Sequence, residues 1–226
     1  MLALLYDVHG NLPALDAVLE DTAKAGAERF LLGGDYAVFG AWPTETVTRL
    51  RELDAEWIRG NVDRWCADSS DAPEPVQNAI DRCRELLGPQ LVGELADLPE
   101  ETVVAGFRFC HASPLNDLES FGTELEEHED ARLLDGASEA RVVFGHTHVQ
   151  FSRLGPGGVE LVNPGSIGMP LDGDHRAAYA LVSDDGDLDL RRVEYDWRAS
   201  VDAVRERLGE AGEIGARRIE QARFDV

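Results

Sequence analysis

The chain has 226 residues, and its 44 aspartates and glutamates outnumber its 21 lysines and arginines to give a formal net charge of −23. Long nucleic acids and anionic membranes would be repelled by most of such a surface, which argues against a partner of either kind. Three cysteines without C-x-x-C spacing argue against a disulfide framework, and no apolar run is long enough for a signal peptide or a membrane span, so we expect a cytoplasmic protein.

The first quarter of the chain predicts strands that alternate with helices. Short apolar runs at 1–6, 30–32 and 57–58 indicate strands. Apolar residues at helical spacing indicate helices over 12–25 and 44–53. This strand–helix–strand–helix–strand order favours a largely parallel sheet.

The middle of the chain predicts more helix. Residues 64–99 have the pattern of a mostly polar helix, and 123–135 that of a charged surface helix. Between and after them, we expect short strands at 102–105, 107–110 and 141–144.

The last third is predicted to be rich in strands and to end in a helical segment over 199–226, interrupted at Gly212 and Gly215. Turns rich in Gly, Pro and Asp separate four strand-like runs, at 149–154, 159–162, 177–183 and 188–195. An α/β half followed by a β-rich half predicts two packed sheets within a single domain over 1–226.

Polar side chains that suit a metal ion follow five of the predicted strands. They are Asp7 and His9, Asp35, Asn61, His111, and His146 and His148. Singly, an aspartate after a strand is commonly a turn or a helix cap, and a lone histidine is commonly structural. Together, at the carboxyl ends of strands, these seven side chains have the right number of ligands for two divalent metal ions that share one carboxylate.

The order of these short motifs resembles that of the calcineurin-like metallophosphoesterase superfamily over about residues 1–170. The motifs are Asp7-x-His9, Gly34-Asp35, Gly60-Asn61-x-Asp63, His111 and Gly145-His146-x-His148. The later segments Asn163-Pro164-Gly165-Ser166, Leu171-Asp172-Gly173-Asp174 and Tyr195-Asp196 are similar to the small single-domain bacterial and archaeal branch. The resemblance implies an α/β fold, a four-layer αββα sandwich of two mixed β-sheets flanked by helices.

The resemblance also implies a centre of two divalent metal ions, with manganese expected and iron, zinc or nickel as alternatives. It assigns the first ion to Asp7, His9, Asp35 and His148, and the second to Asp35, Asn61, His111 and His146. Asp35 would bridge the two ions, and Asn61 and His111 would help to position the phosphate. A hydroxide shared by the two ions would attack phosphorus in line.

Other residues are expected to support this centre. Asn11 either donates to a phosphate oxygen or caps the following helix, and Asp63 is expected to orient a ligand. Gly165 and Ser166 are expected to form a structural turn. Residues 64–99 and 113–130 are the expected walls of a pocket for a small phosphate ester.

Three positions depart from the family pattern. Val62 stands where many relatives have a histidine that donates a proton to the leaving group. Either the leaving group here needs little protonation, or the proton comes from water or from another residue such as His175. Phe39 stands where the protein-phosphatase motif has an arginine that binds the phosphate. Its absence favours a diester, whose organic substituent would pack on Phe39 or Trp42. The alternative is that both aromatic residues are simply part of the core. Ala112 follows His111 where glycine is usual, which predicts a slightly altered second metal site.

These observations predict a metal-dependent phosphoesterase that prefers phosphodiesters. The alternatives are a phosphomonoesterase, acting on nucleotides or proteins, and a non-catalytic metal-binding scaffold of the same fold. The complete set of seven candidate ligands argues against the scaffold. The sequence leaves the oligomeric state open.

Overall fold

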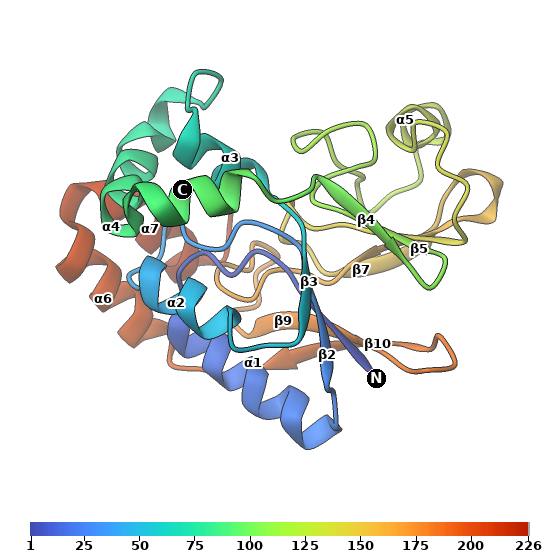
Figure 1. Cartoon of the computed structure of the whole chain (residues 1–226), viewed down its shortest axis with the longest axis horizontal. Helices are drawn as coiled ribbons and strands as arrows, with labels where there is room; N and C mark the ends of the chain where they lie inside the picture. Colours follow the sequence, from blue (N-terminus) through green and yellow to red (C-terminus); the bar gives the residue numbers. More distant parts are fainter. Residues whose placement is uncertain (226) are drawn as a thin grey trace.

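Two five-stranded β-sheets pack against each other at the centre of the molecule (Figure 1). The computed structural model describes residues 1–225. The first sheet has the order β10-β9-β1-β2-β3, formed by Leu188–Val193, Ala177–Val182, Leu2–Leu5, Arg29–Leu32 and Ala55–Trp57. The second has the order β4-β5-β6-β8-β7, formed by Glu101–Val104, Phe107–Cys110, Arg141–Val143, Glu160–Asn163 and Phe151–Leu154.

The predicted parallel start of the first sheet is confirmed. Strands β1, β2 and β3 pair in parallel because two helices, α1 (Leu12–Ala25) and α2 (Pro43–Leu50), return the chain to the same end of the sheet. The side chain of Asn11 caps α1 at its start, and Gly26 ends it with a φ of 78°. Strand β9 then pairs antiparallel with β1, and β10 with β9, so the sheet is mixed.

The second sheet is also mixed. Strands β5, β6 and β8 are parallel, and the edge strands β4 and β7 are antiparallel to their neighbours. Parallel strands end at the same edge of a sheet, so the loops that follow β5 and β6 meet there, as do the loops that follow β1, β2 and β3 in the first sheet. These loops carry the seven candidate ligands.

The helices are distributed unevenly over the two outer faces. Besides α1 and α2, the first sheet is covered by α3 (Asn61–Ala67), α4 (Gln77–Ala96), α6 (Trp197–Leu208) and α7 (Glu213–Gln221). Figure 1 shows these helices gathered on one side of the molecule. The outer face of the second sheet is covered by the two-turn helix α5 (Glu127–Leu133) and by the loop that contains Phe121.

Three groups of buried apolar side chains define the layers. One group, which includes Leu4, Tyr6, Phe109 and Val143, fills the space between the two sheets. A larger group lies between the first sheet and its helices, and a smaller one lies beneath α5. The expected four-layer αββα sandwich is therefore confirmed, with a thin fourth layer. No helix within residues 1–225 is both long and apolar enough to cross a membrane.

Two predicted helices are interrupted. The expected helix over 64–99 is divided into α3, a 3-10 turn (Glu74–Val76) and α4, and α4 itself is broken at Gly88, whose φ of 71° is not helical. The C-terminal helix is interrupted by a 3-10 turn at Gly209–Gly212 and not at Gly215, which is buried within α7. Gly215 was wrongly predicted to interrupt the helix because a glycine in a helix signals either a break or a close contact.

Candidate metal centre

Four of the predicted ligands form a buried cluster. One ligand atom from each of Asp7, His9, Asp35 and His148 lies within 4.8 Å of the other three. The Nε2 atoms of His9 and His148 are 3.1 Å apart, His9 Nε2 is 3.7 Å from Asp35 Oδ2, and His148 Nε2 is 3.5 Å from Asp7 Oδ1. The chain segments around these residues are far apart in the sequence and meet at the ends of β1, β2 and β6.

The hydrogen bonds of the two histidines fix their tautomers. Nδ1 of His9 donates to the carbonyl of Val38 at 3.0 Å, and Nδ1 of His148 donates to the carbonyl of Met169 at 2.6 Å. In the neutral rings, both Nε2 atoms therefore present lone pairs to each other. Asp7 Oδ1 is buried beside them without a hydrogen-bond partner. Acceptors that converge in this way need a cation among them, so these residues fit a metal ion.

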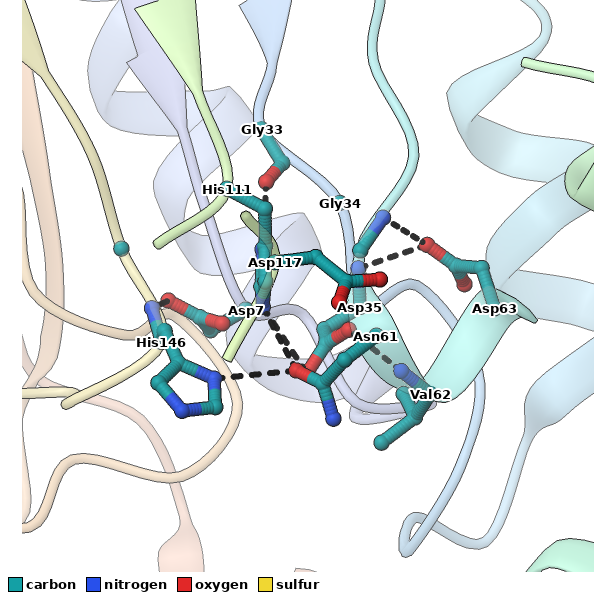
Figure 2. Close-up of polar contacts among 12 residues, drawn as sticks. Asp7, Gly33, Gly34, Asp35, Asn61, Val62, Asp63, His111, Asp117 and His146 are labelled. Carbon is teal, nitrogen blue, oxygen red and sulfur yellow. Dashed lines mark hydrogen bonds and ion pairs between the residues drawn. The ribbon is translucent and has the colours of Figure 1, made fainter. Parts of the chain in front are cut away.

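The other predicted ligands surround the oxygen of Asn61 (Figure 2). His111 Nε2 and His146 Nδ1 each lie 2.9 Å from Asn61 Oδ1, and His111 Nε2 is 3.4 Å from Asp35 Oδ2. Nδ1 of His111 donates to the carbonyl of Gly33 at 2.9 Å, which leaves Nε2 directed at the two oxygens. Asp35 is thus the side chain that contacts both groups.

Burial and charge affect these histidines in different ways. Burial lowers the pKa of His9 and of His146 to about 4, so both rings are neutral and ready to act as ligands. Burial acts in the same direction on His111, but the charge of Asp35 overcomes it and raises the pKa of His111 well above its usual range. Without a metal ion, the His111 imidazolium thus neutralises Asp35.

Backbone strain is concentrated in the cluster. Nine non-glycine residues in the described part of the chain have a positive φ, and five of them are candidate ligands: Asp7, His9, Asp35, His146 and His148. Side-chain-bearing residues rarely adopt this conformation, and it is found where a functional site requires it. Gly60 and Gly145 serve a different purpose, because a Cβ on them would lie 2.1 Å from Asp35 Oδ1 and 2.4 Å from Asp7 Oδ2.

Asp63 acts on the backbone of the site. Its carboxylate accepts hydrogen bonds from the N–H groups of Asp35 at 2.8 Å (Figure 2), Tyr36 at 3.1 Å and Gly60 at 2.9 Å. Burial and the charge of Asp35 raise the pKa of Asp63, while these three hydrogen bonds oppose the rise. Asp63 therefore fixes the loops that carry Asp35 and Asn61.

Asn11 is occupied by structural contacts. Its amide nitrogen donates to the carbonyl of Gly168 and to the hydroxyl of Tyr195, and its oxygen accepts from the backbone of Ala14 and the hydroxyl of Ser200. Of the two predicted roles, the structure favours the helix cap and leaves no free amide hydrogen for a phosphate oxygen.

The predicted turn after β8 supports the ligand loops. Ser166 donates to the carbonyl of Asp7 at 2.7 Å, and Asn163 donates to the carbonyl of Gly145 at 2.9 Å.

Two further residues that the sequence singled out lie in ordinary surroundings. Ala112 is buried and does not have a positive φ, so the backbone accommodates an alanine after His111. His175 contacts the carbonyl of Glu220 and stacks on Trp197 outside the cavity, which removes its suggested role as a proton donor.

A cavity of about 420 Å³ lies over the cluster, and apolar side chains form most of its wall. The predicted wall segments contribute Trp65, Val76 and Leu118. Phe39 also lines the cavity, whereas Trp42 does not. Sequence reasoning missed the contributions of 169–171 and of the C-terminal segment, which are Met169, Leu171, Ile214, Arg218 and Phe224.

Comparison with known proteins gives four findings. A model of the calcineurin-like phosphoesterase superfamily domain matches residues 1–187. An uncharacterized protein of Methanocaldococcus jannaschii is 28% identical, and the match covers 90% of this chain and 91% of that protein. A solved metallophosphoesterase from Sphaerobacter thermophilus is 27% identical, with a TM-score of 0.80 and 98% of each chain covered. A hypothetical protein from Pyrococcus horikoshii, 23% identical, shares the fold with a TM-score of 0.82 over 95% of this chain and 97% of that one.

Proposed function

Because the chain belongs to the calcineurin-like phosphoesterase superfamily, we propose that it hydrolyses small phosphodiesters with two divalent metal ions. The observation that carries the proposal is the position of Asp35. Its carboxylate faces His9 in the first group of candidate ligands and His111 in the second. The first ion would be held by Asp7, His9, Asp35 and His148, and the second by Asp35, Asn61, His111 and His146. Oxygen and imidazole donors without a thiolate suit manganese, iron, zinc or nickel, and of these we propose manganese as the native metal.

The metal ions would lower the pKa of a bound water, and their positive charge would stabilise the phosphoryl oxygens. The chain fixes the ligands before substrate arrives. The carbonyls of Val38 and Met169 hold the rings of His9 and His148, and the backbone N–H of Val62 donates to Asp35 Oδ1 at 3.0 Å. These contacts preorganise the site, so little reorganisation is needed during the reaction.

The preference for a diester rests on the cavity. Its aromatic walls, Phe39 and Trp65, give an apolar surface to a second organic substituent of the phosphorus. Val62 lines the cavity and cannot transfer a proton. We therefore expect rates to depend steeply on the leaving group, with acidic phenols leaving faster than alcohols.

The proposed substrate is small and the proposed location is the cytoplasm. The net charge of −23 opposes the approach of long nucleic acids. Cys66, Cys83 and Cys110 are buried free thiols, as is usual in a reducing compartment.

The test is hydrolysis by protein that has been stripped with a chelator and reloaded with Mn²⁺, Ni²⁺ or Zn²⁺. Matched nitrophenyl diester and monoester substrates are compared, and Asp35→Asn serves as the inactive control. We expect metal-dependent turnover that favours the diester and is lost in Asp35→Asn. A preference for the monoester would instead establish a phosphomonoesterase. Absence of turnover in protein that binds two metal ions would establish the scaffold alternative.

A further inference from the structure

Arg218 places a guanidinium in the mostly apolar wall of the cavity. It belongs to α7, and its neighbours in the wall include Ile214 and Phe224. Its Nε is buried without a hydrogen-bond partner, and no ion pair links the guanidinium to another group within residues 1–225. Burial lowers the pKa of Arg218, and the charge of Asp225 in the exposed tail opposes the change, but a guanidinium stays charged near neutral pH.

Aromatic rings and a close helix contact position this side chain. The guanidinium carbon lies 5.7 Å from the centre of the Phe39 ring and 4.3 Å from that of Phe224. Gly215, one turn earlier on α7, lets the helix approach Phe39, because a Cβ there would lie 2.5 Å from the Phe39 carbonyl oxygen. Phe39 itself has a φ of 83°, which is rare for a bulky residue.

Phe39 also connects Arg218 to the metal centre. The rings of Phe39 and His9 are 5.5 Å apart, and all three side chains line the same cavity. A partly desolvated guanidinium without a charged partner is costly, and two aromatic rings replace only part of its hydration. In a chain with a surplus of acidic residues, this arginine nevertheless forms no ion pair with a carboxylate of residues 1–225, and Asp225 acts on it only from beyond ion-pair distance. Its N–H groups are therefore available to an anion that enters with a ligand.

We propose that Arg218, held by Phe39 and Phe224, is a substrate-binding residue that pairs with a second anionic group on the organic part of the phosphate ester. This inference rests on the proposed function, which places the scissile phosphate at Asp35 and His9. The organic part would then lie along the apolar wall, and its far end would meet the guanidinium. The preferred substrates are therefore phosphate esters with an apolar or aromatic body that also carries a carboxylate or a phosphate.

The test begins with binding, which does not depend on turnover. Calorimetry compares benzylphosphonates, which cannot be hydrolysed, bearing a carboxyl, a second phosphonate or a neutral carbamoyl group on the ring. We expect manganese-loaded protein to bind the two acidic ligands about tenfold or more tightly than the carbamoyl ligand, since a hydrogen bond to a charged group is of that strength. The carboxyl and phosphonate arms show which anion the site prefers.

Variants on α7 separate recognition from stability. Arg218→Met is expected to reduce the preference for the acidic ligands to about one. Arg217→Met is the matched control, because this neighbouring arginine is exposed and pairs with Glu213 outside the cavity. Arg218→Lys keeps the charge and should keep part of the preference. Thermal unfolding of each variant confirms that it is folded.

Three results would overturn the inference. The first is equal binding of charged and neutral ligands by the unaltered protein. The second is a preference that survives in Arg218→Met, which would assign the acidic group to the metal ions. The third is an equal loss of affinity for all ligands in Arg218→Met, which would mean that Arg218 acts only by holding the C-terminal segment around Phe224 in place. Failure of nitrophenyl ester hydrolysis with these binding preferences intact would count against the proposed function alone.

Discussion

Asp35 is held in place by its neighbours on several sides. Its backbone N–H donates to Asp63, its Oδ1 accepts from the N–H of Val62, and its Oδ2 faces His9 and His111. The backbone of Gly60 lies directly against the carboxylate. The position of Asp35, the proposed shared ligand, therefore depends on Gly60, which has no side chain of its own.

This contact predicts the effect of Gly60→Ala. Gly60 has an extended backbone, with φ −93° and ψ 173°, so alanine fails there for lack of space and not for strain. The new methyl group would displace Asp35, and we expect a loss of about 1–3 kcal/mol in the free energy of unfolding together with weaker Mn²⁺ binding. Urea denaturation and a manganese titration measure the two effects.

Gly93→Ala is the matched control for this substitution. Gly93 lies in α4 with nothing within 4 Å of an added Cβ, so alanine should stabilise the helix by about 0.5–1 kcal/mol and leave metal binding unchanged. If Gly60→Ala binds Mn²⁺ as tightly as Gly93→Ala does, metal binding does not depend on the observed position of the Asp35 carboxylate.

The opposed histidines lead to a second prediction at this scale. Without a cation, the lone pairs of His9 and His148 face each other at 3.1 Å, so metal should stabilise the folded state. Mn²⁺ at a hundredfold its Kd is expected to add about 2.7 kcal/mol, seen as a higher Tm of chelator-stripped protein. His148→Gln should lose most of this gain, whereas His175→Gln, outside the cluster, should keep it. Equal gains in both variants would place the stabilising metal elsewhere.

At the scale of elements, α7 connects the C-terminus to the cavity through Gly215. Alanine in a helix is usually stabilising, but a Cβ on Gly215 would lie 2.5 Å from the carbonyl oxygen and 3.0 Å from the Cβ of Phe39. We expect Gly215→Ala to lower the free energy of unfolding by about 1–3 kcal/mol, measured by urea denaturation. A gain in stability like that expected of Gly93→Ala would show that α7 does not pack tightly on Phe39.

The same helix shows where sequence reasoning ends. Local patterns predicted α1 at its observed bounds, and the motif order predicted seven polar side chains that the fold brings together. Gly215 was misjudged and Arg218 was missed because their role depends on a contact with Phe39, which is remote in the sequence. No periodicity within α7 signals that contact. The break within 64–99 was also missed, since polar residues fit a helix and a loop equally well.

At the scale of the whole molecule, acidic residues remain in excess after ion pairing. Several arginines already form ion pairs with two carboxylates each. Arg49 pairs with Asp16 and Glu52, and Arg132 pairs with Glu119 and Glu129. Exposed ion pairs contribute little, whereas the surplus charge repels itself throughout the folded chain. Salt screens both effects, and with a net charge of −23 the relief of repulsion should dominate.

We therefore expect the free energy of unfolding, measured with uncharged urea, to rise between about 0.01 M and about 1 M KCl, where the Debye length falls from about 30 Å to about 3 Å. Replacing Glu28 and Glu56, which are exposed and lie outside the helices, with glutamine should stabilise the protein at low salt and have little effect at high salt. The two treatments relieve the same repulsion, so their effects should not add. A stability that falls with KCl would mean that the ion pairs of residues such as Arg132 outweigh the net charge.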